Sequence, residues 1–147
     1  MIVNKNSLIA LRPIEDMIEG ELIHHESNTS FGLSPCGYNV RLKQSLLLPP
    51  HGFSLASTIE RFTMPLNLVG VVHDKSTNAR RGLSVFNSVI DPGFEGWLTL
   101  ELSNCTNRHI ELLAGQGIAH ILFHEVVHPA MYEGKYQNQP NEPVGAK

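Results

Sequence analysis

From residue 36 onward the chain is a series of short apolar or alternating runs, interrupted by prolines, glycines and polar turns. Turn signals such as Pro49-Pro50, Pro92-Gly93, Gly115 and Gly117 separate the runs. Many short strands at close spacing are typical of a β-sandwich or a β-barrel. We therefore expect a mainly β fold, and no internal repeat is evident. The expected strands cover residues 38–42, 45–48, 53–58, 68–73, 83–87, 97–104, 110–113 and 118–127.

The segment 13–23, ahead of these runs, has a different pattern. Ile14, Met17, Ile18 and Leu22 recur at helical spacing after a proline. This periodicity predicts a short amphipathic helix whose role is packing.

Length and composition narrow the class of protein. A chain of 147 residues fits one domain, and a net charge of −3 argues against a nucleic-acid-coating protein. We see neither a signal peptide nor an apolar stretch long enough for a membrane span. Cys36 and Cys105 are far apart and form no CxxC pair, which suits free thiols in a reducing cytoplasm.

The segment from His73 to Gly82 combines hydroxyl and basic side chains directly after an apolar strand. Residues 76–81 could form one or two helical turns, capped near Asp74 or Ser76. Ser76 and Arg80 would then share one helix face. Amides at the helix start, with Lys75, would make a cradle for phosphate. A solvated basic turn explains the same residues, so both readings stay open.

Glu101 lies in the middle of the expected strand 97–104. Strand periodicity places Leu98, Leu100 and Leu102 on one face, and Thr99, Glu101 and Ser103 on the other. An unpartnered acid is costly to bury, whereas an acid partnered by Ser76 and Arg80 would be a candidate proton shuttle. The alternative is a solvent-facing glutamate on a half-exposed strand.

The run from His124 to His128 matches HExxH, a zinc-binding signature that works on a helix. Here the surrounding run is rich in β-branched residues and ends at Pro129, which favours a strand. In a strand the two histidines would lie more than about 12 Å apart. The zinc deaminase signature, HxE followed by PCxxC, is also absent. We therefore expect no catalytic metal.

Five segments in order resemble the dCTP deaminase family, within the trimeric dUTPase-like superfamily. The resemblance runs from about Ile14 to Gln139. It implies a dUTPase-like distorted β-barrel with jelly-roll character and one or two short helices. Arg80 and Glu101 distinguish the chain from dUTPases, which usually lack both and use an acid corresponding to Asp91. The segments are Gly37–Leu42, Leu68–Gly70 with Lys75–Arg80, Asp91–Gly96 with Leu98–Asn104, Gly115–Ala119 and Gly134–Gln139.

The resemblance implies hydrolytic deamination of dCTP to dUTP and ammonia in pyrimidine deoxynucleotide metabolism. Glu101 would activate the water, with Ser76 and Arg80 positioning it. Mg²⁺ would be bound through the triphosphate, dTTP is a candidate inhibitor, and sites would lie between the subunits of a cytoplasmic homotrimer. The implied nucleotide-binding residues are Lys75, Ser76, Thr77, Asn78, Ala79, Arg80, Ser88, Val89, Asp91, Thr99, Leu100, Glu101, Tyr132, Lys135 and Gln139.

The expected organisation is a β-barrel domain over residues 1–128 and a flexible C-terminal lid over residues 129–147. The last segment is rich in proline, glycine and amide side chains, which also fits plain disorder. Three other functions stay open: a bifunctional deaminase that releases dUMP, a dUTPase with Asp91 as base, and a non-catalytic nucleotide-binding regulator.

Overall fold

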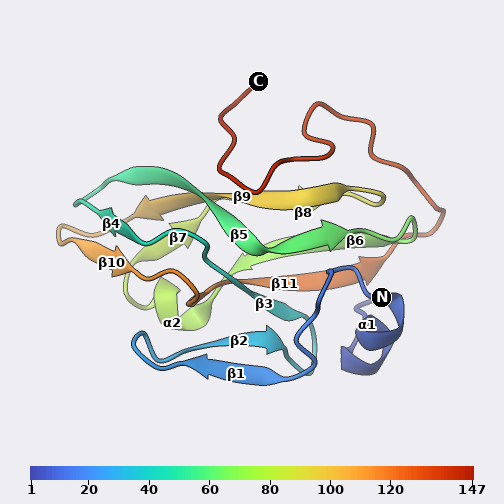
Figure 1. The fold of residues 1–147 in the computed structure, drawn as a ribbon, viewed down its shortest axis with the longest axis horizontal. Coiled ribbons are helices and arrows are strands. Elements are labelled where there is room, and N and C mark those ends of the chain that lie inside the picture. Colours follow the sequence, from blue (N-terminus) through green and yellow to red (C-terminus); the bar gives the residue numbers. More distant parts are fainter.

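The computed structural model describes residues 1–147 as strands stacked between a short N-terminal helix and a C-terminal tail (Figure 1). Its two helices are both short, and none is long and apolar enough to span a membrane. In chain order the elements are α1 (Lys5–Leu11), β1 (Glu21–His24), β2 (Thr29–Leu33), β3 (Tyr38–Arg41), β4 (Leu46–Leu48), β5 (Phe53–Thr63), β6 (Leu68–Asp74), α2 (Ser76–Ala79), β7 (Leu83–Val85), β8 (Val89–Ile90), β9 (Glu95–Asn104), β10 (Ile110–Leu112) and β11 (Gly117–Glu125).

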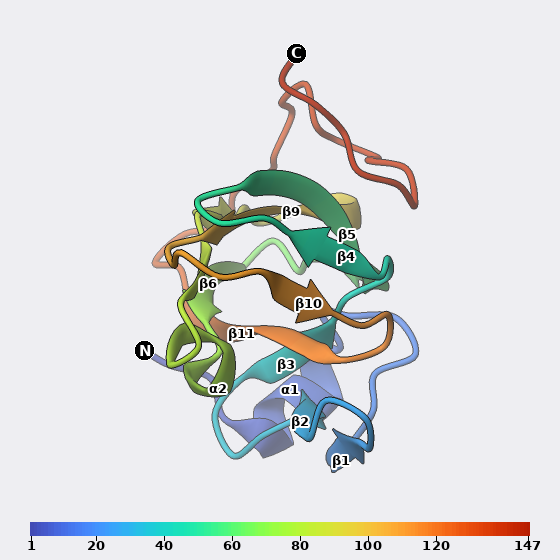
Figure 2. The same cartoon turned by 90° about the vertical axis from the view of Figure 1, so that its left-hand side faces the viewer.

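The strands form three antiparallel sheets. The largest has the order β1-β2-β3-β11-β6-β8, the second has the order β5-β9-β7, and β10 pairs with β4. The views in Figures 1 and 2 agree that β5 and β9 lie at one side of the stack and β1 and β2 at the other. The prediction of a mainly β fold with short helices is confirmed.

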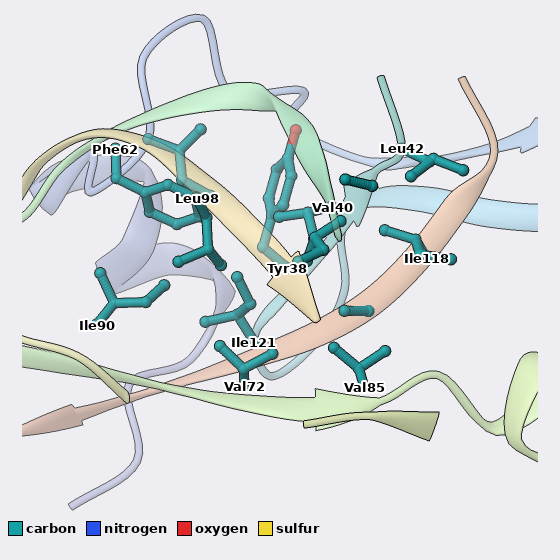
Figure 3. Close-up of a cluster of buried hydrophobic side chains, with 14 of the residues drawn as sticks. Tyr38, Val40, Leu42, Phe62, Val72, Val85, Ile90, Leu98, Ile118 and Ile121 are labelled. Carbon is teal, nitrogen blue, oxygen red and sulfur yellow. The ribbon is translucent and has the colours of Figure 1, made fainter. Parts of the chain in front are cut away.

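The core lies between the two larger sheets because each presents an apolar face to the other. Tyr38 of β3, Phe62 of β5, Val72 of β6, Leu98 of β9 and Ile121 of β11 converge there (Figure 3). Burying an apolar side chain of this size stabilises the fold by about 1.5–3 kcal/mol. These contacts join strands from the whole length of the chain into one unit.

The predicted helix over residues 13–23 is wrong, because the start of this segment pairs with β5 and its last residues belong to β1, which pairs with β2. The helix α1 comes earlier and ends at Leu11, where it is capped by Arg12 with a left-handed φ of 45°. Ile14 forms a bridge with Phe62, and the Glu15 amide donates to the Arg61 carbonyl at 2.9 Å. Tertiary hydrogen bonds therefore prevent a helix in this segment despite its helical spacing. The spacing arises here only because some of its apolar side chains face the core.

All eight expected strands are present, with shifted ends. The strand β5 is much longer than expected, and three further strands, β1, β2 and β8, were missed. In the missed hairpin of β1 and β2, Leu22 and Ile23 are exposed, so the usual alternation of apolar and polar faces is absent.

A buried ion pair marks the irregular part of β5, where the pairing with β9 shifts register between Ser57 and Arg61. Glu60 points inward there and accepts from the backbone amide of Arg41 at 2.9 Å and from its Nε at 2.8 Å. Burial raises the pKa of Glu60, and Arg41 opposes that rise. Burial, aided by the nearby Glu60 charge, also raises the pKa of Tyr38 to about 12.

Candidate active site

A pocket of about 500 Å³ lies between the second half of β9, the segment around β8 and the C-terminal tail. Strand β9 presents Thr99 and Glu101 to this pocket, as strand periodicity predicts. Among the lining residues are Phe53, Leu55, Asn87, Ser88, Val89, Asp91, Phe94, Tyr132, Tyr136, Gln139, Val144 and Ala146.

Glu101 is half-buried, and its carboxylate has no hydrogen-bond or salt-bridge partner within the chain. Its position is therefore set by the backbone. On one side Glu101 pairs with Leu55 of β5. On the other side its carbonyl accepts from the Phe86 amide at 2.9 Å, and its amide donates to Asn87 Oδ1 at 2.9 Å. An unpartnered carboxylate facing a pocket is free to exchange a proton with a bound molecule.

The C-terminal tail closes one side of the pocket. Gln139 forms a parallel bridge with Gly96, and its Oε1 accepts from Thr99 Oγ1 at 2.9 Å. The Val144 amide donates to the same Thr99 oxygen at 3.0 Å. Tyr132 packs edge-on against Phe94, with ring centroids 6.0 Å apart. The tail therefore contributes side chains to the same pocket as Glu101.

Seven of the predicted site residues line this one pocket. They come from three separate parts of the chain that only the fold brings together. They are Ser88, Val89, Asp91, Thr99, Glu101, Tyr132 and Gln139.

Ser76 and Arg80 lie elsewhere, so one chain alone does not bring these two residues to Glu101. The predicted turn of helix is present as α2, but its Ser76, Thr77, Ala79 and Arg80 are exposed on another part of the surface. In Figures 1 and 2, α2 lies on the opposite side of the stack from the tail.

Arg80 lines a second, basic pocket of about 360 Å³ together with Arg81 and Arg108. None of these three arginines is paired with a carboxylate, whereas Arg12, Arg41 and Arg61 all are. The molecule thus separates an unpaired acid, Glu101, from a group of unpaired arginines.

Lys75 and Asn78 are buried, and neither lines the Glu101 pocket. The Lys75 ammonium points inward and donates to Ser30 Oγ at 2.9 Å and to Asn39 Oδ1 at 3.3 Å. Burial lowers the pKa of Lys75. Asn78 is also buried and donates to the Gly117 carbonyl at 3.0 Å. Asn78 thus holds α2 against β11, and Lys75 ties the start of α2 to β2 and β3. A helix this short needs such tertiary anchors.

Asn39 Oδ1 also faces His120, whose Nδ1 lies 3.1 Å away and donates to it when that nitrogen carries a proton. His120 Nε2 lies 3.0 Å from the Cys36 carbonyl oxygen. Burial lowers the pKa of His120, and the adjacent Lys75 charge acts in the same direction. This polar cluster is a structural support of the sheet and lies outside the Glu101 pocket.

Two more predicted residues lie outside the pocket. Leu100 is fully buried in the core because it points to the face of β9 opposite Glu101. Lys135 is exposed and its ammonium contacts the carbonyl of Lys147. In the HExxH run, His124 belongs to β11, which ends at Glu125, so the expectation of a strand there is confirmed.

The sequence reasoning missed Asn87, which lines the pocket and binds β9 through both ends of its amide. It also missed Phe53, Leu55 and Tyr136. Nothing in the local pattern around Asn87 separates it from an ordinary turn asparagine. The position of Asn87 beside Glu101 becomes clear only from the register in which β7 pairs with β9.

The fold is that of the dUTPases. The EIAV dUTPase superposes with a TM-score of 0.58 at 22% identity, over 68% of this chain and 83% of that one. The dUTPase of Staphylococcus bacteriophage 80alpha gives a TM-score of 0.60 at 14% identity, over 79% and 88%. These likenesses place the molecule in the class of dUTPase-like β proteins.

Within this class, the chain belongs to the dCTP deaminase-like family, whose family model matches residues 35–126. The dCTP deaminase of Campylobacter curvus (strain 525.92) is 43% identical over 98 residues, 63% of this chain and 53% of that protein. That of Acinetobacter baumannii (strain AYE) is 44% identical over 98 residues, 63% and 52%. The chain thus spans about half the length of these relatives.

Proposed function

We propose that the protein catalyses the hydrolytic deamination of dCTP to dUTP and ammonia, as part of pyrimidine deoxynucleotide metabolism. The observation that carries the proposal is the unpartnered Glu101 carboxylate in a pocket, in a chain of the dCTP deaminase-like family. The sequence relatives are named dCTP deaminases. Deamination needs one group that takes a proton from water and later returns it to the leaving nitrogen.

In the proposed reaction, Glu101 accepts a proton from a water whose oxygen attacks C4 of the cytosine ring. Glu101 passes this proton to N3 of the ring and then takes the proton of the new C4 hydroxyl. It gives that second proton to the exocyclic nitrogen, which leaves as ammonia as its bond to C4 breaks, and C4 becomes a carbonyl. Asp91 and Thr99 line the same pocket and would contact the deoxyribose and the base. Tyr132, Lys135 and Gln139 would cover the bound nucleotide as parts of a closing lid over residues 129–147, which would exclude water.

We propose that a second copy of the chain supplies Ser76 and Arg80 to each site. The support is complementarity: Glu101 lacks a cationic partner, and Arg80 lacks an acidic one. A surface on one copy that fits a different surface on the next forms a closed ring when the rotation between copies closes. A homotrimer with sites at its subunit interfaces is the arrangement that the family resemblance implies.

Mg²⁺ would enter with the triphosphate. No group of three or more His, Cys, Asp or Glu side chains lies together in a way that could hold a metal ion. Bound to the nucleotide, the ion would neutralise phosphate charge. We propose dTTP as an inhibitor, since it presents the same triphosphate, and a cytoplasmic location, in keeping with the exposed free thiols of Cys36 and Cys105.

A second candidate function is cleavage of dUTP to dUMP and pyrophosphate with Asp91 as the base, alone or after deamination. Two observations favour it: the fold is shared with dUTPases, and Asp91 lines the same pocket as Glu101. A protein that binds nucleotides without turnover would be built from the same pocket.

The test is to incubate the protein with Mg²⁺ and dCTP, or with Mg²⁺ and dUTP, and to resolve the products chromatographically with a parallel ammonia assay. We expect dUTP and ammonia from dCTP. Release of dUMP and pyrophosphate from dCTP would establish the bifunctional variant. Cleavage of dUTP without turnover of dCTP would replace the proposal by a dUTPase. Binding of dCTP or dUTP without turnover of either would indicate a non-catalytic nucleotide-binding regulator.

A further inference from the structure

We propose that Asn87 is a positioning residue of this site, which sets the place of Glu101 and of the pocket wall opposite it. The inference rests on the proposed function and adds a residue that lies in none of the motif segments of the sequence. It is carried by the hydrogen bonds between the segment 86–89 and two different sheets.

The strand β7 ends just before the level of Glu101. It pairs with β9 from Leu83 opposite Asn104 to Val85 opposite Leu102, and then the chain leaves the sheet. Backbone groups of β9 beyond this point would lose their partners on this edge, which is costly when they are buried. These are the groups next to the proposed base.

The Asn87 side chain replaces the missing strand. Its Oδ1 accepts from the Glu101 amide at 2.9 Å, and its Nδ2 donates to the Thr99 carbonyl at 2.7 Å. One side-chain amide thus makes the two bonds that a backbone peptide group would make in a strand. Both distances are typical of good hydrogen bonds.

The same segment is held from the other side by β6. The Val72 amide donates to the Ser88 carbonyl at 3.1 Å, and Val89 pairs with Val71. Ser88 and Val89 are therefore fixed between the two sheets and form a wall of the pocket. Asn87 is the only side chain in this segment that bonds to β9.

Since the Glu101 carboxylate has no partner of its own in the chain, its place depends on its backbone. The side-chain amide of Asn87 fixes that backbone and, with it, the pocket wall formed by Ser88 and Val89. Loss of Asn87 would move the base relative to the bound cytosine. A displacement of about 1 Å at a reacting group can cost about 100-fold in rate.

The test compares Asn87→Ala and Asn87→Asp with Asn107→Ala, an exposed asparagine in the loop between β9 and β10. We expect Asn87→Ala to lower kcat for dCTP about 10- to 100-fold, with KM changed much less and Asn107→Ala unchanged. Asn87→Asp keeps the acceptor for the Glu101 amide but adds a negative charge. It should therefore move the acid limb of the kcat–pH profile to higher pH.

A purely structural asparagine would lower the melting temperature but leave kcat per folded site and the pH profile unchanged, and that result would overturn the proposal. Amide hydrogen exchange distinguishes failure of the positioning role of Asn87 from failure of the proposed deaminase function. If the wild-type protein does not turn over dCTP, faster exchange of the Glu101 amide in Asn87→Ala still supports the positioning role. Unchanged exchange in that variant refutes it.

Discussion

Glu101 is the residue on which the proposed chemistry depends. Glu101→Gln keeps the shape of the side chain and removes its ability to accept a proton. We expect ammonia release from dCTP to fall by at least about 100-fold, with nucleotide affinity and assembly retained. The measurement is single-turnover ammonia release beside calorimetric nucleotide binding. Retained deamination would remove Glu101 from the mechanism.

Arg41 and Glu60 allow a prediction of stability. Arg41→Ala leaves the buried Glu60 carboxylate without its partner, which should cost about 3 kcal/mol of unfolding free energy near pH 8. Burial then raises the pKa of Glu60 further, because only backbone hydrogen bonds still oppose that rise. The carboxyl group can therefore take up a proton in the folded state at low pH, and the loss should be smaller near pH 5 than near pH 8.

Denaturant unfolding at the two pH values measures this effect. The control is Arg12→Ala, which removes the exposed pair of Arg12 with Glu19 and should cost less than about 1 kcal/mol at either pH. Equal losses at pH 5 and pH 8 in Arg41→Ala would show that Glu60 does not take up a proton when Arg41 is absent.

The structure places some of the predicted site residues at the pocket and others away from it, for a physical reason. Thr99 and Glu101 could be placed because strand periodicity alone decides which face they occupy. The same strand periodicity turns the Leu100 side chain away from the pocket, although the family resemblance implies that Leu100 binds the nucleotide. Lys75 could not be placed, because its burial depends on Ser30 and Asn39, which lie far away in the sequence.

At the scale of elements, strands with clear turn signals were predictable, and elements set by tertiary pairing were not. The segment 13–23 has helical spacing but bonds to β5. The hairpin of β1 and β2 has exposed apolar residues on one strand, so no alternation reveals it. The tail was expected to be flexible from composition, and its bonds to β9 could not be foreseen from composition.

Gly96 offers a test of how the tail docks. It has a φ of 129°, and a Cβ at this position would lie 2.6 Å from the Gln139 amide nitrogen. Gly96→Ala should therefore loosen the tail, raise KM for the nucleotide and speed tryptic cleavage after Lys135 several-fold. Gly20→Ala is the matched control, since nothing lies within 4 Å of a Cβ there. Equal cleavage rates would contradict the proposed docking.

At the scale of the whole molecule, the separation of Glu101 from Arg80 makes a subunit-mixing experiment decisive. Glu101→Gln and Arg80→Ala should each be inactive alone. If each site takes Glu101 from one copy and Arg80 from the next, mixed assemblies regain activity, because some interfaces join the two intact residues. Random 1:1 mixing should restore about one quarter of the sites in a ring. The measurement is dCTP turnover after co-expression, with separately purified variants mixed without exchange as control.

No recovery in verified mixed assemblies would mean that both residues act from the same copy or that Arg80 is not needed. Strand and helix patterns could not distinguish these cases, since they order residues along one chain. The family resemblance implies sites between subunits, and the placement of α2 away from the pocket agrees with that arrangement.

The tail has one more consequence, for self-association. The Asn138 amide bonds to the Glu95 carbonyl and the Trp97 amide to the Gln139 carbonyl, on the edge of β9 that β5 does not use. Without the tail, these groups would form an open strand edge beside apolar side chains. Open edges of this kind pair with other chains. Proteolytic loss of the residues after Pro129 would therefore expose a site for aggregation as well as an uncovered pocket.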